Sequence, residues 1–124
     1  MVKKANTDEQ RERCREYLRE QKLESPTDCF LYIDGPEGNI TGVCGITIGI
    51  CDHYKMGYVE PFYTDNNISS LKLYCAAEGF LLGCNCKYSV VGCEENMINE
   101  RMYTELGYKK WSSNFNQYIK NIGE

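Results

Sequence analysis

The amino-acid sequence predicts an α+β fold with a mixed α/β sheet, in which an antiparallel meander is followed by a βαβ crossover. Between residues 29 and 63, three stretches rich in β-branched and aromatic residues are separated by short turn sequences. From 67 to 83 the apolar residues change to a helical period, and from 86 to 92 they return to a strand-like run. A strand, a long helix and a second strand in this order are typical of a parallel pair joined by a right-handed crossover.

The first element is predicted to be a helix. Thr7 and Gln10 have the spacing of a capping box, and the helix then continues to about Leu23. Its thin apolar stripe consists of Cys14, Tyr17 and Leu18. A thin stripe is typical of a helix that lies on the surface of a larger body, and Pro26 disfavours helical geometry in the residue before it. We therefore expect the chain to open directly in a helix, with no strand ahead of it.

The meander is predicted to have strands at 29–33, 40–50 and 56–63. The sequences DGPEGN and CDHYK between them are rich in turn-forming residues. Pro61 falls inside the third strand and has no N–H to donate to a sheet. This strand should therefore end, bulge or lose a partner at Pro61.

The second half of the chain is predicted to contain two helices and three strands. The helix at 67–83 is apolar on nearly every side, so it should be well buried, with Gly83 as its C-terminal cap. A strand at 86–92 follows and should be parallel to the third strand. A second helix at 94–106 should stop at Gly107, and YKKW and NFNQYIKNI should form two closing strands.

Composition narrows the class of partner. With 124 residues, we expect a single domain over 1–124 that buries its own core. Because 18 acidic and 14 basic residues give a net charge of −4, neither nucleic acid nor an anionic membrane is expected as a partner. No apolar stretch approaches the roughly 20 residues of a membrane span, and the first residues lack the apolar segment of a signal peptide. We therefore expect a cytoplasmic protein.

Eight cysteines raise the question of a crosslink or a metal site. A disulfide framework suits secreted chains, and no Cys-x-x-Cys pair occurs here. The looser groups are Cys84, Cys86 and Cys93, and Cys44, Cys51 and His53. Neither has zinc-site spacing. Since most cysteines lie in apolar runs such as GVCGITIGIC and LYCAAEGF, we expect reduced, buried thiols and no metal.

Two segments carry a family resemblance. YVEPFYTDNNISSL (58–71) has a Val, a Pro two residues later, a turn and then a helix. NMINERMYTELGY (96–108) has Asn96, then Tyr103 seven residues on, then Gly107 and Tyr108. In this order and spacing, residues 28 to 121 resemble the Gcn5-related N-acetyltransferase (GNAT) family. The resemblance implies a GNAT-like acyl-CoA N-acyltransferase fold, acetyl-CoA as cosubstrate and an amine as acceptor.

The resemblance also implies which residues bind the cosubstrate. A helix N-terminus offers backbone N–H groups and a favourable dipole to a pyrophosphate, which fits the loop at 64–70. The predicted cofactor-binding residues are Val59, Thr64, Asn66, Asn67, Ile68, Ser69, Ser70 and Asn96. Asn96 would also mark the start of its helix.

Catalysis by this family implies an acid for the departing thiolate and a base for the amine. Tyr103 would be the acid. Glu60 is the first candidate for the base and His53 the second. The structural alternatives are a half-buried helix tyrosine for Tyr103, a solvent-facing strand residue for Glu60 and an exposed turn residue for His53.

The sequence departs from the family pattern in two places. The phosphate loop of the family usually has a Gln or Arg, two residues, a Gly, one residue, and a Gly or Ala, whereas this chain reads TDNNIS from Thr64 to Ser69. Asn67 can adopt the left-handed conformation that Gly would, but Asp65 places a negative charge beside the expected pyrophosphate. The family also usually begins with a strand, which we expect to be absent here. In the family this part normally helps to build the acceptor site, so the sequence does not indicate the acceptor. A second copy in a homodimer could complete the sheet.

Two functional hypotheses follow. The first is an N-acetyltransferase that moves an acetyl group from acetyl-CoA to an amine of a small molecule or a protein. The alternative is a catalytically degenerate member that keeps the fold as a binding or assembly module. The Val-Pro and Asn-to-Tyr spacings favour the first, and the phosphate loop favours the second.

Overall fold

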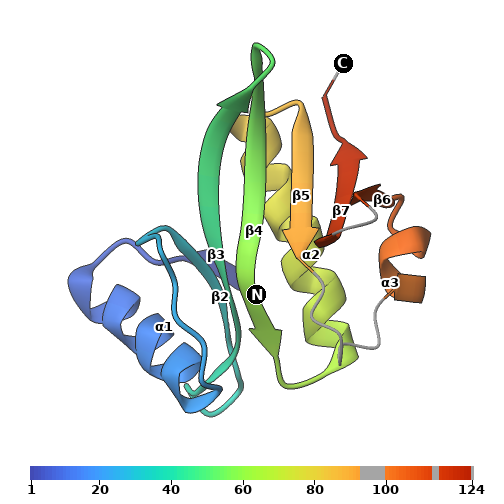
Figure 1. Ribbon diagram of the computed structural model, residues 1–124. Coiled ribbons are helices and arrows are strands. Elements are labelled where there is room, and N and C mark those ends of the chain that lie inside the picture. Colours follow the sequence, from blue (N-terminus) through green and yellow to red (C-terminus); the bar gives the residue numbers. More distant parts are fainter. Residues whose placement is uncertain (93–99, 113–114, 124) are drawn as a thin grey trace.

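The computed structural model describes residues 1–92, 100–112 and 115–123, drawn as coloured ribbon in Figure 1. The elements are β1 (Val2–Lys4), α1 (Asp8–Glu20), β2 (Phe30–Asp34), β3 (Ile40–Cys51), β4 (Tyr54–Thr64), α2 (Asn67–Gly83), β5 (Tyr88–Gly92), α3 (Glu100–Glu105), β6 (Lys109–Ser112) and β7 (Phe115–Asn121). The predicted α+β class is confirmed.

The strands form one seven-stranded sheet in the order β1-β2-β3-β4-β5-β7-β6. All neighbours are antiparallel except β4 and β5, which are parallel. Strands β2 to β4 are the predicted meander, and β4, α2 and β5 are the predicted crossover. None of the helices that the structure describes combines the length and apolarity needed to cross a bilayer.

The two long helices cover opposite faces of the sheet (Figure 1). On what we call the α1 face, Cys14, Tyr17 and Leu18 pack against Phe30, Tyr32 and Val43. On the α2 face, Leu73, Tyr74, Ala77 and Leu81 pack against Leu31, Ile33, Cys44, Ile46 and Val59. Successive strand residues alternate between these faces, so the position of a residue in its strand decides which helix it meets.

The chain does not open in a helix, and this expectation is wrong. Strand β1 comes first and pairs antiparallel with β2, with Val2 opposite Ile33 and Lys4 opposite Leu31. Three residues that include two lysines are too short and too polar to show a strand pattern in the sequence. The chain therefore covers the edge of β2 itself, which removes the reason for expecting a second copy at that position.

Helix α1 begins as predicted. The Thr7 hydroxyl accepts a hydrogen bond from the Gln10 N–H at 3.1 Å, and the Gln10 side-chain oxygen accepts one from the Thr7 N–H at 3.1 Å. The helix ends at Glu20, earlier than the predicted Leu23, and Lys22 has a positive φ of 61°. Helix α3 ends at Glu105, two residues before Gly107, which has a φ of 92°, and the predicted start of this helix at residue 94 lies outside the described residues.

Helix α2 is only partly buried, so the expectation of a well-buried helix is wrong. Leu73, Tyr74, Ala77 and Leu81 face the sheet. The opposite side carries Ile68, Leu71, Cys75, Gly79 and Leu82, which are exposed. An almost uniformly apolar helix gives no periodic signal for its inner face. Its C-cap is Cys84, and Gly83 is its last helical residue.

A bulge interrupts the pairing of β3 and β4 where Pro61 predicted an irregularity. Cys44 lies opposite Phe62 and Ile46 opposite Val59, so Gly45 faces both Glu60 and Pro61. A Cβ on Gly45 would lie 2.9 Å from the Glu60 carbonyl oxygen, so only glycine fits this close approach without a shift. The peptide bond between Glu60 and Pro61 is cis.

Candidate functional site

Strands β4 and β5 part at the bulge. Their parallel pairing ends at Val59 and Val91, and β5 ends at Gly92. Strand β4 continues to Thr64 and pairs only with β3 over this stretch, as Figure 1 shows. The side of β4 that faces β5 therefore has no strand partner from Glu60 onward among the described residues. A splayed strand of this kind can receive an extended ligand that hydrogen-bonds to the backbone.

Glu60 lies at the point where the strands part. Its carboxylate occupies the space that a Cβ on Gly92 would take, so the glycine makes room for it. Val59 points to the α2 face, and Glu60 as the next residue points to the α1 face. The predicted base thus lies beside the end of β5, in a close approach to Gly92 that no local pattern in the sequence indicates.

Tyr103 meets the same glycine from α3. Its side chain is fully buried, and its hydroxyl donates a hydrogen bond to the Gly92 carbonyl oxygen at 3.1 Å. Tyr103 belongs to the core cluster of the α2 face. The predicted acid and the predicted base therefore meet at Gly92 from opposite faces of the sheet.

A cluster of tyrosines surrounds Tyr103. Its ring lies 5.4 Å from Tyr74, 6.0 Å from Tyr108 and 4.9 Å from Tyr118, measured between centroids. The Tyr74 hydroxyl lies 2.5 Å from the Tyr103 hydroxyl, and the Tyr108 hydroxyl is bonded to Ser89 at 2.8 Å. Burial raises the pKa of Tyr74 and of Tyr108 well above the ordinary value of a phenol. These two hydroxyls therefore stay protonated.

At the predicted phosphate loop, the N-terminus of α2 is capped by side chains of the loop itself. Asn66 is the N-cap of α2, and its side-chain oxygen accepts a hydrogen bond from the Ser69 N–H at 2.8 Å. The Thr64 hydroxyl bonds to the Ser70 hydroxyl and donates to the Asn66 carbonyl at 3.0 Å. Four of the predicted residues are thus joined in one local network that holds the turn into α2.

The first two N–H groups of α2 are available. Asn67 and Ile68 are exposed, and their amides have no hydrogen-bond partner among the described residues. Such groups at a helix N-terminus suit an anion. This part of the loop therefore fits a pyrophosphate, although neither residue is a glycine.

The Asp65 carboxylate forms its hydrogen bond with α1 and not with these two amides. Its backbone N–H donates to the Thr41 carbonyl at 2.8 Å, and its carboxylate accepts a hydrogen bond from the Tyr17 hydroxyl of α1 at 2.6 Å. Burial, followed by this hydrogen bond to Asp65, raises the pKa of Tyr17. The negative charge of the Asp65 carboxylate is therefore bound by a side chain of α1.

The remaining predicted residues lie elsewhere. Val59 is 1% exposed and packs in the core, so only its backbone lies at the strand opening. Asn96 lies outside the described residues. His53 is exposed at the turn between β3 and β4, seven residues before Glu60, which is about 23 Å along a strand. The structure therefore does not bring His53 to Glu60.

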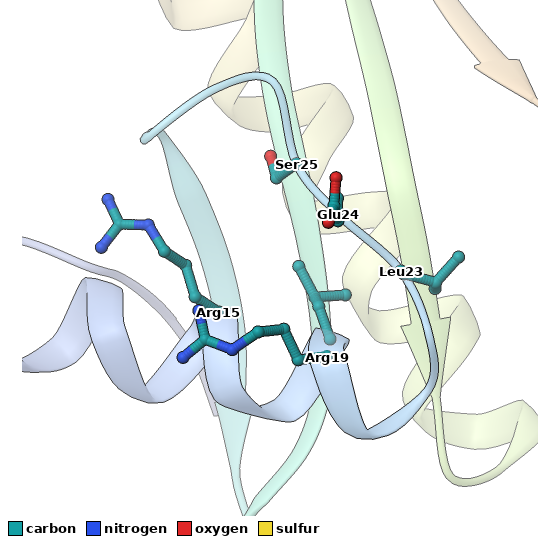
Figure 2. Close-up of a pocket in the computed structure, with 6 residues that line it drawn as sticks. Arg15, Arg19, Leu23, Glu24 and Ser25 are labelled. Atoms are coloured by element: carbon teal, nitrogen blue, oxygen red, sulfur yellow. The ribbon is translucent and has the colours of Figure 1, made fainter.

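A small pocket lies on the α1 face, below the loop that follows α1 (Figure 2). It is lined by Arg15, Leu18, Arg19, Leu23, Glu24 and Ser25. The Ser25 hydroxyl lies 2.9 Å from the position of a Cβ on Gly45, as the Glu60 carbonyl does. The pocket therefore adjoins the bulge on the face to which Glu60 points. No pattern in the sequence predicts this pocket, because its walls come from a helix end and an irregular loop.

The cysteines do not form a site among the residues that the structure describes. No group of three or more His, Cys, Asp or Glu side chains there could hold a metal ion. The seven described cysteines are free thiols, and Cys14, Cys44 and Cys86 are buried. Cys51 and Cys75 are exposed, so the expectation of buried thiols is wrong for these two. Their apolar neighbours in the sequence belong to element faces that are open to solvent.

This order of strands and helices, with the sheet opened between β4 and β5, is the acyl-CoA N-acyltransferase fold of the GNAT family, and the predicted resemblance is confirmed. A GNAT acetyltransferase from Staphylococcus aureus Mu50 has a TM-score of 0.71 at 14% identity, over 99% of this chain and 100% of that one. A putative acetyl transferase from Pyrococcus furiosus gives 0.73 at 16% identity, over 90% and 95%.

A third similar structure is the NatC complex bound to Gag peptide and CoA, with a TM-score of 0.76 at 13% identity over 98% of this chain and 97% of that one. No protein-family model matches the sequence, and neither does any curated protein. At these identities the likeness establishes the fold.

Proposed function

We propose that this protein is an N-acetyltransferase that moves an acetyl group from acetyl-CoA to an amine. The observation that carries the proposal is the meeting of Glu60 and Tyr103 at Gly92, where β4 and β5 part. A base and an acid on opposite sides of a strand opening suit a reaction with two substrates. The acceptor would approach from the α1 face, and the thioester would lie toward Tyr103.

The residues that would hold acetyl-CoA follow from the same geometry. The amides of Asn67 and Ile68 would bind the pyrophosphate with the favourable end of the α2 dipole. The backbone of β4 beyond Val59 would bind the extended arm, because β5 has already ended there. Acetyl-CoA itself supplies the activated acetyl thioester.

The proton transfers fall to the chain's own side chains. Glu60 would take a proton from the incoming ammonium, so that the neutral amine can attack the acetyl carbonyl carbon. As the carbon–sulfur bond breaks, Tyr103 would give its hydroxyl proton to the departing thiolate. The second proton that the attacking nitrogen loses would pass to solvent, from which Tyr103 recovers its own. One amide bond forms, one thioester bond breaks, and a single proton is released overall.

The alternative is a binding or assembly module that has lost catalysis. The phosphate loop favours it, since Asn66 takes up the Ser69 N–H and Asp65 adds a negative charge. This module would keep the tyrosine cluster as a core and would have no measurable affinity for acetyl-CoA.

Calorimetric titration with acetyl-CoA, together with the shift in melting temperature, separates the two. An enzyme should bind with a Kd in the micromolar range. At a ligand concentration of 100 times Kd, binding adds about 2.7 kcal/mol, which should raise the melting temperature of a domain this size by roughly 10 °C. If neither binding heat nor a shift in melting temperature appears at millimolar acetyl-CoA, the enzyme hypothesis is ruled out and the binding or assembly module is favoured.

A further inference from the structure

The hydroxyls of Tyr74 and Tyr103 are joined by a hydrogen bond whose direction follows from the other partner of Tyr103. The two hydroxyls are 2.5 Å apart, and the Tyr103 hydroxyl also donates to the Gly92 carbonyl at 3.1 Å. A carbonyl oxygen can only accept, so the Tyr103 proton lies on the Gly92 side. The proton between the two hydroxyls therefore belongs to Tyr74.

The ring of Tyr74 is buried and packs against two other rings. Its side chain is 1% exposed, and its ring stacks on Phe62 with centroids 3.9 Å apart and an angle of 7°. Its ring also meets Tyr103 edge-on at 78°. Phe62 lies on β4, beyond the point where the strands part, so Tyr74 is fixed to the same opening as Tyr103.

Building on the proposed function, we infer that Tyr74 is a positioning residue that holds the Tyr103 hydroxyl and stabilises its phenolate. When Tyr103 gives its proton to the thiolate sulfur, a negative charge remains on its oxygen. A hydrogen bond from Tyr74 to that oxygen then becomes a charge-assisted bond, which is stronger than the neutral bond that precedes it. A bond that strengthens during the reaction accelerates it. Tyr74 keeps its own proton throughout.

The test is Tyr74→Phe, with Tyr108→Phe as the matched control. Each variant removes one buried tyrosine hydroxyl from the same cluster, but the Tyr108 hydroxyl bonds to Ser89 and not to Tyr103. Turnover is measured as release of CoA from acetyl-CoA by chromatography, with spermidine and a mixture of short peptides with free N-termini as amine probes. Loss of a hydrogen bond to a charged group should lower kcat about ten- to a hundredfold in Tyr74→Phe. Tyr108→Phe should stay within about twofold.

Two further readouts separate positioning from simple packing. Without its donor, the Tyr103 phenolate is less stable, so the alkaline limb of the kcat–pH profile should move to higher pH in Tyr74→Phe. The double variant Tyr74→Phe/Tyr103→Phe should also be no slower than Tyr103→Phe alone, because Tyr74 acts only through Tyr103.

The three possible outcomes lead to different conclusions. An equal loss of kcat in Tyr74→Phe and Tyr108→Phe, with an unmoved pH profile, would assign Tyr74 to packing alone and overturn the inference. A wild-type protein that binds no acetyl-CoA and releases no CoA would overturn the proposed function, and the inference with it. An active wild type whose Tyr74→Phe variant keeps full turnover would overturn the inference only.

Discussion

The two ends of the candidate site are built in different ways. At Gly92, side chains from β4, α2 and α3 converge, and both Tyr103 and Tyr74 are almost completely buried. At the N-terminus of α2, the residues from Asp65 to Ile68 are exposed, and the hydrogen bonds there join loop residues to one another, to Thr41 and to Tyr17. The first end depends on the packing of the whole sheet, and the second depends on a few hydrogen bonds near the surface. If the proposed function holds, catalytic geometry and cosubstrate affinity should therefore respond to separate substitutions in this chain.

Tyr103→Phe should have the largest effect. Removing the proton donor should lower turnover by roughly 10²–10⁴-fold, whereas the Kd for acetyl-CoA, set at the other end of the site, should change little. CoA release and calorimetric titration measure the two quantities. Tyr118→Phe keeps the ring that contacts Tyr103 and serves as the control. Unchanged turnover would show that Tyr103 is not the proton donor. The proposed difference between the two ends of the site would then be wrong.

Glu60→Gln should lower turnover by about 10²-fold at neutral pH, because the amide cannot accept the proton of the ammonium. Its melting temperature should be that of the wild type, since Glu60 is exposed. Glu37→Gln, an exposed glutamate in the turn before β3, is the matched control. If Glu60→Gln retains wild-type turnover with the amine probes, the base must be sought elsewhere.

Gly92→Ala should move the Glu60 carboxylate without disturbing the fold. The added methyl group would occupy the place of the carboxylate, which is the far end of a flexible side chain and can swing aside. We expect turnover to fall about tenfold, as one step of general-base catalysis is impaired, with little change in unfolding free energy. Gly79→Ala, where a Cβ meets nothing within 4 Å, should leave turnover unchanged. Full activity in Gly92→Ala would mean that the position of the carboxylate is immaterial.

Asp65→Asn should have the smallest effect and should appear only in binding. Asparagine keeps an oxygen for the Tyr17 hydroxyl and removes the negative charge near the α2 N-terminus. A like-charge contact of on the order of 1 kcal/mol corresponds to about fivefold tighter acetyl-CoA binding, with a smaller gain at high salt. Asp52→Asn, at the tip of the β3–β4 turn, is the control. An affinity that Asp65→Asn leaves unchanged would show that Tyr17 already directs the charge away.

The sequence was informative wherever pattern and turn chemistry agreed. The meander, the crossover, the capping box of α1 and the irregularity at Pro61 were all predicted and are present. Strand β1 was missed because three residues carry no periodic signal. The inner face of α2 was not predictable, because a helix that is apolar all round buries whichever side the sheet meets.

The candidate site was predictable in its types of residue and not in its contacts. Glu60 and Tyr103 followed from the family resemblance, but their common neighbour Gly92 has no sequence signal beyond being a glycine at a strand end. Tyr74 was predicted only as part of an apolar helix, since its partner lies 29 residues further along the chain. Contacts of this kind depend on the register of the sheet, which local patterns do not determine.

The bulge opposite Gly45 makes the length of β4 more critical than most of its side chains. With the extra residue in place, Val59 and Phe62 both face α2, and Tyr63 faces α1. Without this bulge, the same residues in plain alternation would turn Phe62 toward α1 and Tyr63 toward α2, which would remove the ring on which Tyr74 stacks, and one residue inserted between Pro61 and Phe62 would do the same. Deleting Pro61 together with the bulge would instead keep Phe62 toward α2. Related chains that keep this site should therefore tolerate many substitutions in this strand, and the joint loss of the bulge and its extra residue, but not the gain of a single residue.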